Sequence, residues 1–401
     1  MKRDIRELSI EDIRRFCIEQ GMKAYVSNQV YSWIWNNACS SFSDMSNLSK
    51  KNREIFIEHF SINKIVEDYH EKSTDGTIKI KFKLFDGNFV EGVLIPQDKR
   101  MTACISSQVG CSLSCKFCAT GTIGRIRNLT AGEIYDQVVA IGDKSKEFYD
   151  LPLTNIVFMG MGEPLLNYKN VIRSIHFITS EEGLQMSYKR VTLSTSGIAK
   201  MIRRLADDKV KVNLALSLHA ASEKIRNEIM PIGDANSLED LRDSLKYYFS
   251  KTKNKITYEY VLLKDVNDSI SEAEKLYRFT KHIPSKVNLI EYNPVEGLGF
   301  DKSSQENTDA FVDFLDNKGV NNEFFNIGTG KGNSVLEIIN SFEKVTGKKV
   351  VYKIGPRRPG DITAAYADNE KALKYLHWKP NYSLEDALLS AWNWEKNYRK
   401  T

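Results

Sequence analysis

The sequence lacks any apolar run long enough to cross a membrane, and residues 1–8 are charged and lack the apolar core of a secretory signal. Cysteine is scarce: six cysteines in 401 residues do not suggest a disulfide framework, and three of them stand together between positions 111 and 118. These absences argue against the membrane and secreted classes of protein. We therefore expect a protein of the reducing cytoplasm with no membrane partner.

Neither the composition nor the charge of the chain is extreme. Hydrophobic residues make up 41% of the chain and charged residues 27%, as in ordinary soluble globular proteins. The length allows two or three domains with a substantial core. The net charge of +5 is compatible with RNA binding but does not indicate it, because many soluble enzymes carry as much.

The chain is organised around Cys111, Cys115 and Cys118, a Cys-x3-Cys-x2-Cys array that follows an apolar, strand-like segment. Short spacings in a loop bring several thiolates into one small volume at low entropic cost, as an iron–sulfur cluster requires. Three thiolates leave one iron of a four-iron cluster open. Zinc normally takes four ligands and finds no fourth cysteine or histidine at suitable spacing. The array therefore predicts an iron–sulfur cluster, with zinc and unliganded buried thiols as the alternatives.

The hydrophobic periodicity changes along the chain. Residues 1–60 have apolar positions at helix spacing and predict a small helical domain. Residues 61–98 contain two short runs of alternating polar and apolar residues, joined by an Asp-Gly pair that is typical of a hairpin. Residues 99–320 alternate between strand-like and helix-like patterns, and residues 321–401 differ in kind from what precedes them.

The alternating region predicts a parallel sheet. We expect strands at residues 101–106, 155–159, 190–194, 212–217, 256–262 and 287–292, with helices between them at residues 131–141, 168–178, 198–206, 238–249 and 270–282. Repeated strand–helix units favour a parallel sheet with crossover helices, and a partial barrel is its natural closure. In that architecture the functional residues lie at the carboxyl ends of the strands.

Polar residues follow several of these predicted strands. Gly162 and Glu163 come after the second strand, where a glycine allows close backbone approach to a ligand and a carboxylate suits an ammonium group. Ser194 ends the third strand and offers a hydroxyl to a carboxylate or a ribose. His219 follows the fourth strand, although a lone histidine at a strand end is more often structural than catalytic. Asn293 follows the sixth strand and offers the paired donor and acceptor atoms that suit an adenine edge.

Residues 101–111, 119–122 and 127–134 resemble the RlmN family of radical S-adenosylmethionine (SAM) RNA methyltransferases, and the resemblance continues to about Val320. It implies methylation of C2 of adenosine in 23S rRNA and tRNA, with a [4Fe–4S] cluster and two SAM molecules per turnover. The implied fold is α/β: a partial (β/α)6 TIM-like radical SAM barrel at residues 99–320, a small helical amino-terminal domain that recruits RNA, and an α/β carboxyl-terminal extension. The implied partners are the two RNAs and an electron donor such as flavodoxin or ferredoxin, and a monomer is the default.

The resemblance also implies roles for individual residues. Glu91 is the proton-accepting carboxylate, although the alternation along its strand also fits an exposed position with no such role. Cys104 is the thiol that resolves a covalent RNA adduct. Lys264 is a candidate RNA contact, with a solvated lysine as the plainer interpretation. The three clustered cysteines hold the cluster, and the predicted SAM-binding set is Gly162, Glu163, Ser194, Ser217, Leu218, His219 and Asn293.

The resemblance changes near Val320. Four later segments resemble the carboxyl-terminal part of UDP-glucose 4-epimerases instead: residues 324–337, 356–361, 366–369 and 376–381. In that family, the residues that Arg358 and Asp361 match help to hold the nucleotide sugar. The dinucleotide-binding fold and the Tyr-x3-Lys pair of an epimerase are absent upstream, so the chain resembles a fusion of two truncated parts. The hypothesis of a nucleotide-sugar enzyme rests on this tail alone.

Enzymes of the RlmN type end with a second catalytic cysteine, which accepts a methyl group from one SAM and presents it to the radical made from another. No cysteine occurs after Cys118. Serine and threonine do not replace it, because a thiolate is both nucleophilic enough to take a methyl group and stable enough to carry it. We therefore expect the chain to bind cluster and SAM but to complete RNA methylation poorly or not at all. The alternative is a catalytically inactive RNA- or ribosome-binding protein.

Overall fold

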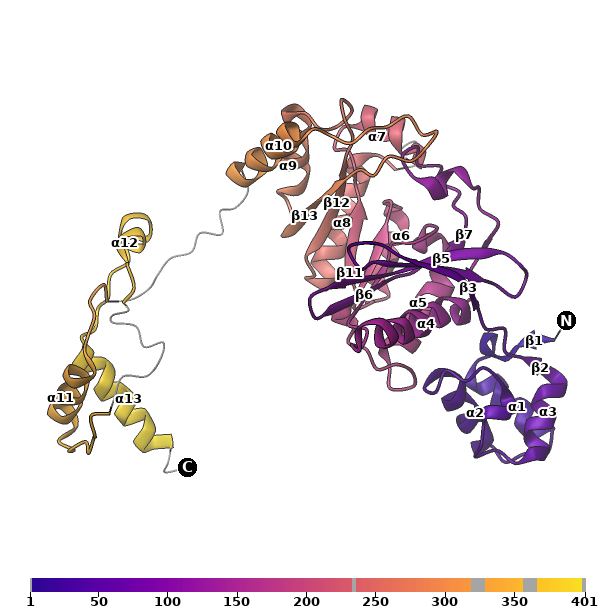
Figure 1. The fold of residues 1–401 in the computed structure, drawn as a ribbon, viewed down its shortest axis with the longest axis horizontal. Coiled ribbons are helices and arrows are strands. Elements are labelled where there is room, and N and C mark those ends of the chain that lie inside the picture. The colour runs from indigo at the N-terminus through magenta and orange to yellow at the C-terminus, as the bar shows by residue number, and fades with distance from the viewer. Residues whose placement is uncertain (1, 233–235, 319–328, 356–365, 399–401) are drawn as a thin grey trace. The chain divides into compact units, whose positions relative to one another are not determined.

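The computed structural model describes residues 2–232, 236–318, 329–355 and 366–398. The chain divides into two compact units, Met1–Gly319 and Val320–Thr401 (Figure 1). Within the described ranges, no helix has both the length and the apolar character needed to span a membrane.

The first unit begins with three helices and a two-stranded parallel sheet: β1 (Arg3–Asp4), α1 (Ile10–Glu19), α2 (Tyr25–Trp35), α3 (Lys50–His59) and β2 (Phe60–Ser61). Helix α1 starts at a capping box, in which the side chains of Ser9 and Asp12 accept backbone N–H groups from each other's residues. The ring of Trp35 stacks on Phe177 with 3.6 Å between ring centroids. The helical segment therefore packs directly on the barrel that follows.

A nine-stranded mixed sheet forms the centre of this unit, in the order β13-β12-β11-β10-β9-β6-β5-β4-β3. The strands from β13 to β6 pair in parallel, and β5, β4 and β3 continue the sheet in antiparallel pairs. The bounds are β3 Val66–Lys72, β4 Ile78–Lys83, β5 Phe89–Gln97, β6 Arg100–Cys104, β9 Asn155–Phe158, β10 Val191–Thr195, β11 Asn213–Ser217, β12 Ile256–Leu262 and β13 Ser285–Glu291. The six parallel strands confirm the predicted partial barrel.

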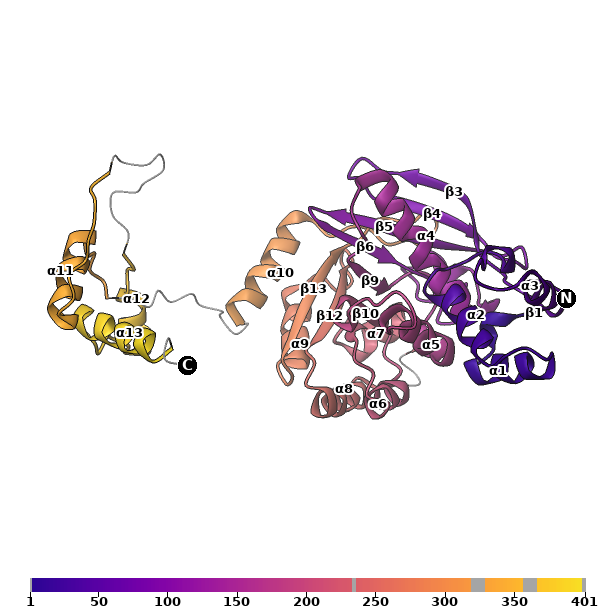
Figure 2. The ribbon, with the colours of Figure 1, turned by 90° about the horizontal axis from the view of Figure 1, so that it is seen from below.

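Helices follow the parallel strands and cover one face of the sheet, since such crossovers keep one hand. Figure 2 shows α5, α6, α8 and α9 along the outside of the curved sheet. A small ribbon of β7 (Gln108–Val109) and β8 (Arg127–Asn128) flanks the cysteine loop. The helix bounds are α4 Ala131–Tyr149, α5 Tyr168–Thr179, α6 Ala199–Asp207, α7 Glu223–Ile229, α8 Leu238–Thr252, α9 Ile270–Thr280 and α10 Gln305–Lys318. The short α7 has no counterpart among the predicted helices.

The antiparallel extension has the predicted half-buried character. In β4, Ile78, Ile80 and Phe82 are fully buried, whereas the lysines between them are exposed. Strand β4 pairs with β5 in an antiparallel register, and the turn between them contains the Asp-Gly pair. The hairpin prediction is therefore confirmed, because the period of two sorts apolar side chains onto one face of the ribbon.

The second unit is described over three helices: α11 (Val335–Thr346), α12 (Glu370–Leu376) and α13 (Leu384–Tyr398). The rings of Phe342 and Trp392 meet edge-on, with 5.4 Å between centroids, and join α11 to α13. The described residues of this unit form no strand, and Ala372 is the one among them whose side chain is recorded as buried. Arg358 and Asp361 lie outside the described residues.

Candidate cofactor site

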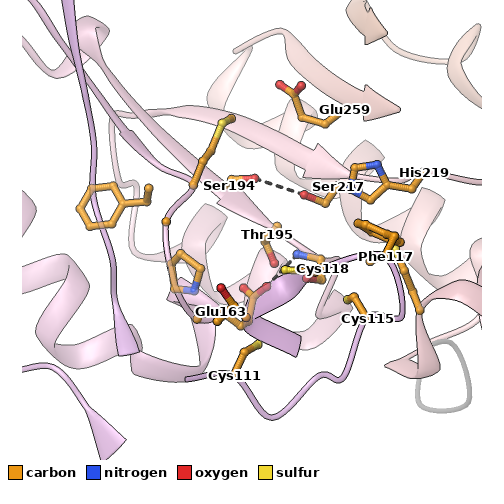
Figure 3. A pocket seen from close by; sticks show the side chains of 18 of the residues that line it. Cys111, Cys115, Phe117, Cys118, Glu163, Ser194, Thr195, Ser217, His219 and Glu259 are labelled. Carbon is orange, nitrogen blue, oxygen red and sulfur yellow. Dashed lines mark hydrogen bonds between the residues drawn. The ribbon is translucent and has the colours of Figure 1, made fainter. Parts of the chain in front are cut away.

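A cavity of about 260 Å³ lies at the carboxyl ends of the parallel strands (Figure 3). The loop after β7 brings the three clustered cysteines to one wall, and the ends of β9, β10, β11 and β12 form the others. The polar residues that line it are Cys111, Cys115, Cys118, Thr120, Glu163, Ser194, Thr195, Ser196, Ser217, His219 and Glu259.

The cysteine loop is fixed by two glycines and by α7. Gly110 has a φ of +73°, and a side chain there would meet a backbone oxygen at 2.0 Å. Gly121 leaves room for the carbonyl oxygen of Cys115, which a Cβ would approach to 2.6 Å. The backbone N–H of Lys116 donates to the carbonyl oxygen of Ile229, at the end of α7, at 2.9 Å. These contacts constrain the shape of the loop.

The three cysteines are free thiols, and each is partly exposed. Burial first, and then the neighbouring Cys118 and Cys111, raise the pKa of Cys115 to about 12. Thiols in this setting ionise when a metal supplies compensating charge. In the described part of the chain, no three or more His, Cys, Asp or Glu side chains are grouped to hold a single metal ion. A cluster requires no such group because its thiolates bind different irons, so the donor set fits an iron–sulfur cluster.

Glu163 is a buried carboxylate in the cavity wall. Its Oε1 accepts the N–H of Leu165 at 3.0 Å, and its Oε2 accepts the N–H of Ser196 at 2.7 Å. Burial raises the pKa of Glu163, and these hydrogen bonds oppose that effect. Gly162 has a φ of +96°, and a Cβ there would come within 2.5 Å of the Gln108 side chain, so this position requires glycine. The carboxylate is thus held at a fixed place where it can bind a cationic amino group.

Side chains on β10, β11 and β12 form a second polar group in the cavity. The Oγ atoms of Ser194 and Ser217 are 3.4 Å apart. Glu259 is the parallel register partner of Ser217 and is buried. Its Oε2 accepts a hydrogen bond from Asn288 Nδ2 at 2.7 Å, and burial raises its pKa. Figure 3 shows Glu259 and the two serines on the opposite side of the cavity from Cys111.

His219 is held in one orientation and one tautomer. Its Nδ1 accepts the backbone N–H of Val261 at 3.1 Å, so the proton of the neutral ring is on Nε2. Burial first, and then the charge of Arg226, lower the pKa of His219 to about 3. The ring of Phe117 meets the imidazole edge-on, with 4.9 Å between centroids. His219 therefore offers the cavity an N–H donor rather than a positive charge.

Two residues of the predicted SAM-binding set do not line the cavity. Leu218 is fully buried, and its backbone N–H donates to the carbonyl oxygen of Glu259 at 3.0 Å. Asn293 is exposed just beyond the end of β13. The structure therefore brings together Gly162, Glu163, Ser194, Ser217 and His219, and leaves Leu218 and Asn293 outside the lining.

Glu91 and Cys104 lie on the adjacent strands β5 and β6, also outside the lining. Val93 pairs with Cys104, and Cys104 pairs with Val157 of β9. Because side chains alternate along a strand, Glu91, Val93 and Cys104 face the same side of the sheet. Lys79 of β4 forms an ion pair with Glu91 at 2.9 Å, and both side chains are about half exposed. The exposed position predicted for Glu91 is confirmed, and its role as a proton acceptor stays a prediction.

Known proteins match most of the first unit. The radical SAM superfamily matches residues 105–279, and the N-terminal domain of ribosomal RNA large subunit methyltransferase matches residues 3–62. The probable dual-specificity RNA methyltransferase RlmN of Christiangramia forsetii is 52% identical over 319 residues, which cover 80% of this chain and 91% of that protein. The dual-specificity RNA methyltransferase RlmN of Geobacter sulfurreducens is 43% identical over 78% of this chain and 85% of that protein. The chain belongs to the RlmN family.

A solved radical SAM methyltransferase from Sphaerobacter thermophilus has the same fold, with a TM-score of 0.74 and 35% identity over 79% of this chain and 93% of that chain. Membership of the radical SAM superfamily implies a [4Fe–4S] cluster and SAM as cofactors. The cavity of this RlmN-family chain fits both, because its thiols and its buried carboxylate line one cavity.

Sequence reasoning missed Glu259 and Arg226. A signal for Glu259 was present, since it is a lone carboxylate inside the apolar strand β12, the same feature that singled out Glu91. Arg226 gave no signal, because α7 reads as a short polar helix with charges of both signs. It is 1% exposed, and its Nη2 donates to the carbonyl oxygen of Ser196, a contact between distant parts of the sequence.

Proposed function

We propose that this chain is an RlmN-type radical SAM enzyme that acts on adenosine in 23S rRNA and tRNA. The observation that carries the proposal is the single cavity in which Cys111, Cys115 and Cys118 lie with the buried carboxylate of Glu163. The relatives are named as dual-specificity RNA methyltransferases, which supports RNA as the substrate. A cluster held by the three thiolates supplies the electron that cleaves SAM.

The cavity residues are assigned to SAM by their chemistry. Both oxygens of Glu163 already accept backbone N–H groups, and their remaining lone pairs suit the ammonium group of SAM. The hydroxyls of Ser194 and Ser217 suit carboxylate or ribose oxygens, and the Nε2–H of His219 suits a neutral or anionic acceptor. Gly162 allows the backbone to approach the ligand, and we retain Leu218 and Asn293 as predicted contacts.

We assign the later steps on the RNA to Glu91 and Cys104. Glu91 accepts the proton that leaves C2 of the adenine, and Cys104 releases the covalent adduct. Their placement on one side of the sheet supports this assignment. Oε1 of Glu91 is in the ion pair with Lys79, and its half-exposed carboxylate is accessible to a substrate.

The domains predicted from the sequence are each given a role. We propose that residues 1–60 recruit RNA, that the strands of residues 61–98 extend the barrel, and that residues 99–320 carry the chemistry. The separate match of residues 3–62 to an rRNA methyltransferase N-terminal domain supports the first assignment. Lys264 stays a candidate RNA contact. We also propose a monomer that receives electrons from flavodoxin or ferredoxin, in a cytoplasmic location that is supported by six free cysteines.

The step that we expect to fail is the methyl transfer. The last cysteine of the chain is Cys118, so no residue matches the family's second catalytic cysteine. We therefore propose that SAM cleavage is retained and that methylation is slow or absent. The second candidate function, a catalytically inactive RNA- or ribosome-binding protein, is favoured by this same missing cysteine.

We propose that residues 321–401 derive from the carboxyl-terminal part of a nucleotide-sugar epimerase. The alignment with the first relative spans 319 residues, about the length of the first unit. The exposed apolar side chains of the tail, such as Val351 and Ile354, support an origin in a larger fold that covered them. Failure of the chain to bind UDP-glucose in a titration would remove a ligand-binding role for Arg358 and Asp361.

The proposed function is tested by anaerobic reconstitution with iron and sulfide, followed by incubation with reductant, labelled SAM and a 23S rRNA fragment. 5′-Deoxyadenosine and 2-methyladenosine are measured separately. We expect the first product without the second. Formation of both products would show that another group carries the methyl. Formation of neither, with the cluster assembled, would contradict the enzyme and favour the binding protein.

A further inference from the structure

Arg226 in α7 is a buried arginine that uses only part of its hydrogen-bonding capacity. Its side chain is 1% exposed, and its Nη2 donates to the carbonyl oxygen of Ser196 at 2.6 Å. Its Nε and Nη1 have no hydrogen-bond partner among the residues that the structure describes. Burying a guanidinium with unsatisfied donors is costly, so such a group calls for an acceptor.

Within the described residues, no carboxylate forms a hydrogen bond with Arg226. Burial lowers the pKa of Arg226 to about 10, and Cys115 and then Glu223 oppose this effect. Glu223 lies one turn earlier in α7, and its Oε1 accepts the backbone N–H of Leu238 instead of bonding the arginine. Asp234 lies outside the described residues. The test below therefore includes an Asp234→Asn variant, which checks whether this carboxylate is a partner of Arg226.

Arg226 lies in a helix that contacts the cysteine loop, and its side chain binds a residue that contacts Glu163. Its helix ends at Ile229, whose carbonyl oxygen holds the cysteine loop through the N–H of Lys116. On the other side, the residue that it binds, Ser196, donates its own N–H to Glu163. The backbone of one residue, Ser196, therefore lies between the guanidinium and the carboxylate that we assign to SAM, with its C=O bound to Arg226 and its N–H bound to Glu163.

We propose that Arg226 is the buried counter-charge of the iron–sulfur cluster, with its Nε–H and Nη1–H available to sulfur acceptors at Cys115. The proposal rests on the proposed function, since it requires a cluster on the three cysteines. A cluster on three thiolates is net negative and becomes more negative on reduction. A fixed positive charge in a buried site therefore favours both cluster binding and the reduced form.

The test compares wild type with Arg226→Met, Arg226→Lys and the control Arg173→Met, all as full chains reconstituted anaerobically. Arg173 is partly buried and donates to the backbone oxygens of Glu7 and Leu8, in the amino-terminal segment of the chain. Iron and sulfide per chain are measured first. The reduction of the bound cluster is then titrated by electron paramagnetic resonance, and melting is followed without the cluster.

We expect Arg226→Met to hold at least threefold less cluster than wild type, or to have a reduction equilibrium constant about tenfold lower, a shift of about 59 mV. Arg226→Lys should recover most of this loss because it keeps the charge, and Arg173→Met should behave as wild type. Without the cluster, Arg226→Met should melt no lower than wild type, because an unpaired buried charge has been removed.

Two results would overturn the inference. The first is that Arg226→Met has the same cluster content and the same cluster reduction potential as wild type. A change of equal size in Arg226→Met and Arg226→Lys would overturn the inference in the same way, because the lysine keeps the charge. The second concerns the melting temperature of the cluster-free chain. If Asp234→Asn lowers this temperature and the double variant Asp234→Asn/Arg226→Met restores it, then the charge of Arg226 already has a carboxylate partner. A wild-type chain that takes up no cluster would contradict the proposed function instead.

Discussion

The two units of this chain differ in what their helices are packed against. In the first unit, helices and a nine-stranded sheet share a large core, and a smaller buried cluster lies beside the cysteine loop. In the second, the helices have sound local signals: α11 starts at a capping box of Ser334 and Glu337 and ends at Gly347 in the left-handed conformation. Large apolar side chains of the second unit nevertheless stay exposed, among them Val335 in α11 at 73% and Val351 after α11 at 99%.

The difference shows that local helix signals do not by themselves produce a binding site. The cavity of the first unit is built from residues far apart in sequence, such as Cys115, Glu163 and Glu259, and strand register brings them together. The described part of the tail has no strands to provide such a register. Chemistry should therefore depend on the first unit and be insensitive to changes in the second.

The largest expected effect is on the cluster. Cys115→Ala removes one of three ligands, and we expect bound iron to fall at least tenfold after reconstitution. Cys39→Ala is the matched control, because Cys39 is a buried core cysteine with no role in the cavity. Iron analysis and visible absorption distinguish the two. Equal loss of iron in both variants would contradict the assignment of the ligands.

The next effect is on stability. Arg6 joins the helical segment to α4 through Asp4 at 2.9 Å and Asp136 at 2.7 Å, all buried. Arg6→Met leaves the buried carboxylate of Asp4 without an ion-pair partner and leaves Asp136 paired with Lys64 alone, which should cost the first unit about 3 kcal/mol of unfolding free energy. Trp392→Ala in the tail should leave that free energy unchanged. Urea unfolding of both variants checks the contrast, and equal destabilisation would contradict it.

Glu163→Gln tests SAM binding. The amide NH2 group must face either the N–H of Leu165 or that of Ser196, and the charge partner of the SAM ammonium is lost. We expect SAM affinity to fall about 100-fold, or about 2.7 kcal/mol, with cluster content unchanged. Equilibrium dialysis with labelled SAM measures it. Undiminished affinity would remove Glu163 from the proposed contacts.

The smallest effect is on pH dependence. The hydrogen bond from Arg127 holds the pKa of Asp86 at about 2, below its usual 3.8. A carboxyl with a depressed pKa stabilises the fold above its unfolded pKa and loses that contribution as pH falls through the folded value. Asp86→Asn should therefore cost about 1 kcal/mol at pH 7, and this difference should shrink between pH 4 and pH 2.

Glu343→Gln in the tail serves as its control, since Glu343 pairs with an exposed Lys349. It should not change the unfolding of the first unit at any pH. A difference for Asp86→Asn that is constant with pH would show that the Arg127 contact does not depend on the carboxylate charge.

Much of the fold was predictable because its signals are local. The period of two in β4 and the strand–helix alternation of the barrel depend on neighbouring residues alone, and the structure reproduces both. Strand β3 was missed as a separate element, since its residues are almost all exposed and give little apolar pattern. Helix α7 was missed because it is short and acquires its burial from contacts with the cysteine loop.

Site residues were predictable from the sequence where the residue type itself indicates a role, as for clustered cysteines. They were less predictable where the role depends on contacts between strands. Cysteine spacing and the Gly162–Glu163 pair pointed to the cavity directly. The neutral tautomer of His219 depends on the N–H of Val261 on another strand, which the sequence does not reveal. The omission of Leu218 and Asn293 from the lining likewise follows from how strand ends are oriented.

The central claim is that the first unit alone contains the SAM-cleaving site. It is tested most directly by comparing the full chain with a chain that ends at Lys318, both reconstituted with iron and sulfide and supplied with reductant and SAM. The account predicts 5′-deoxyadenosine yields within about twofold of each other, because no described tail residue lines the cavity. Loss of this product in the shorter chain, with its cluster intact, would contradict the account.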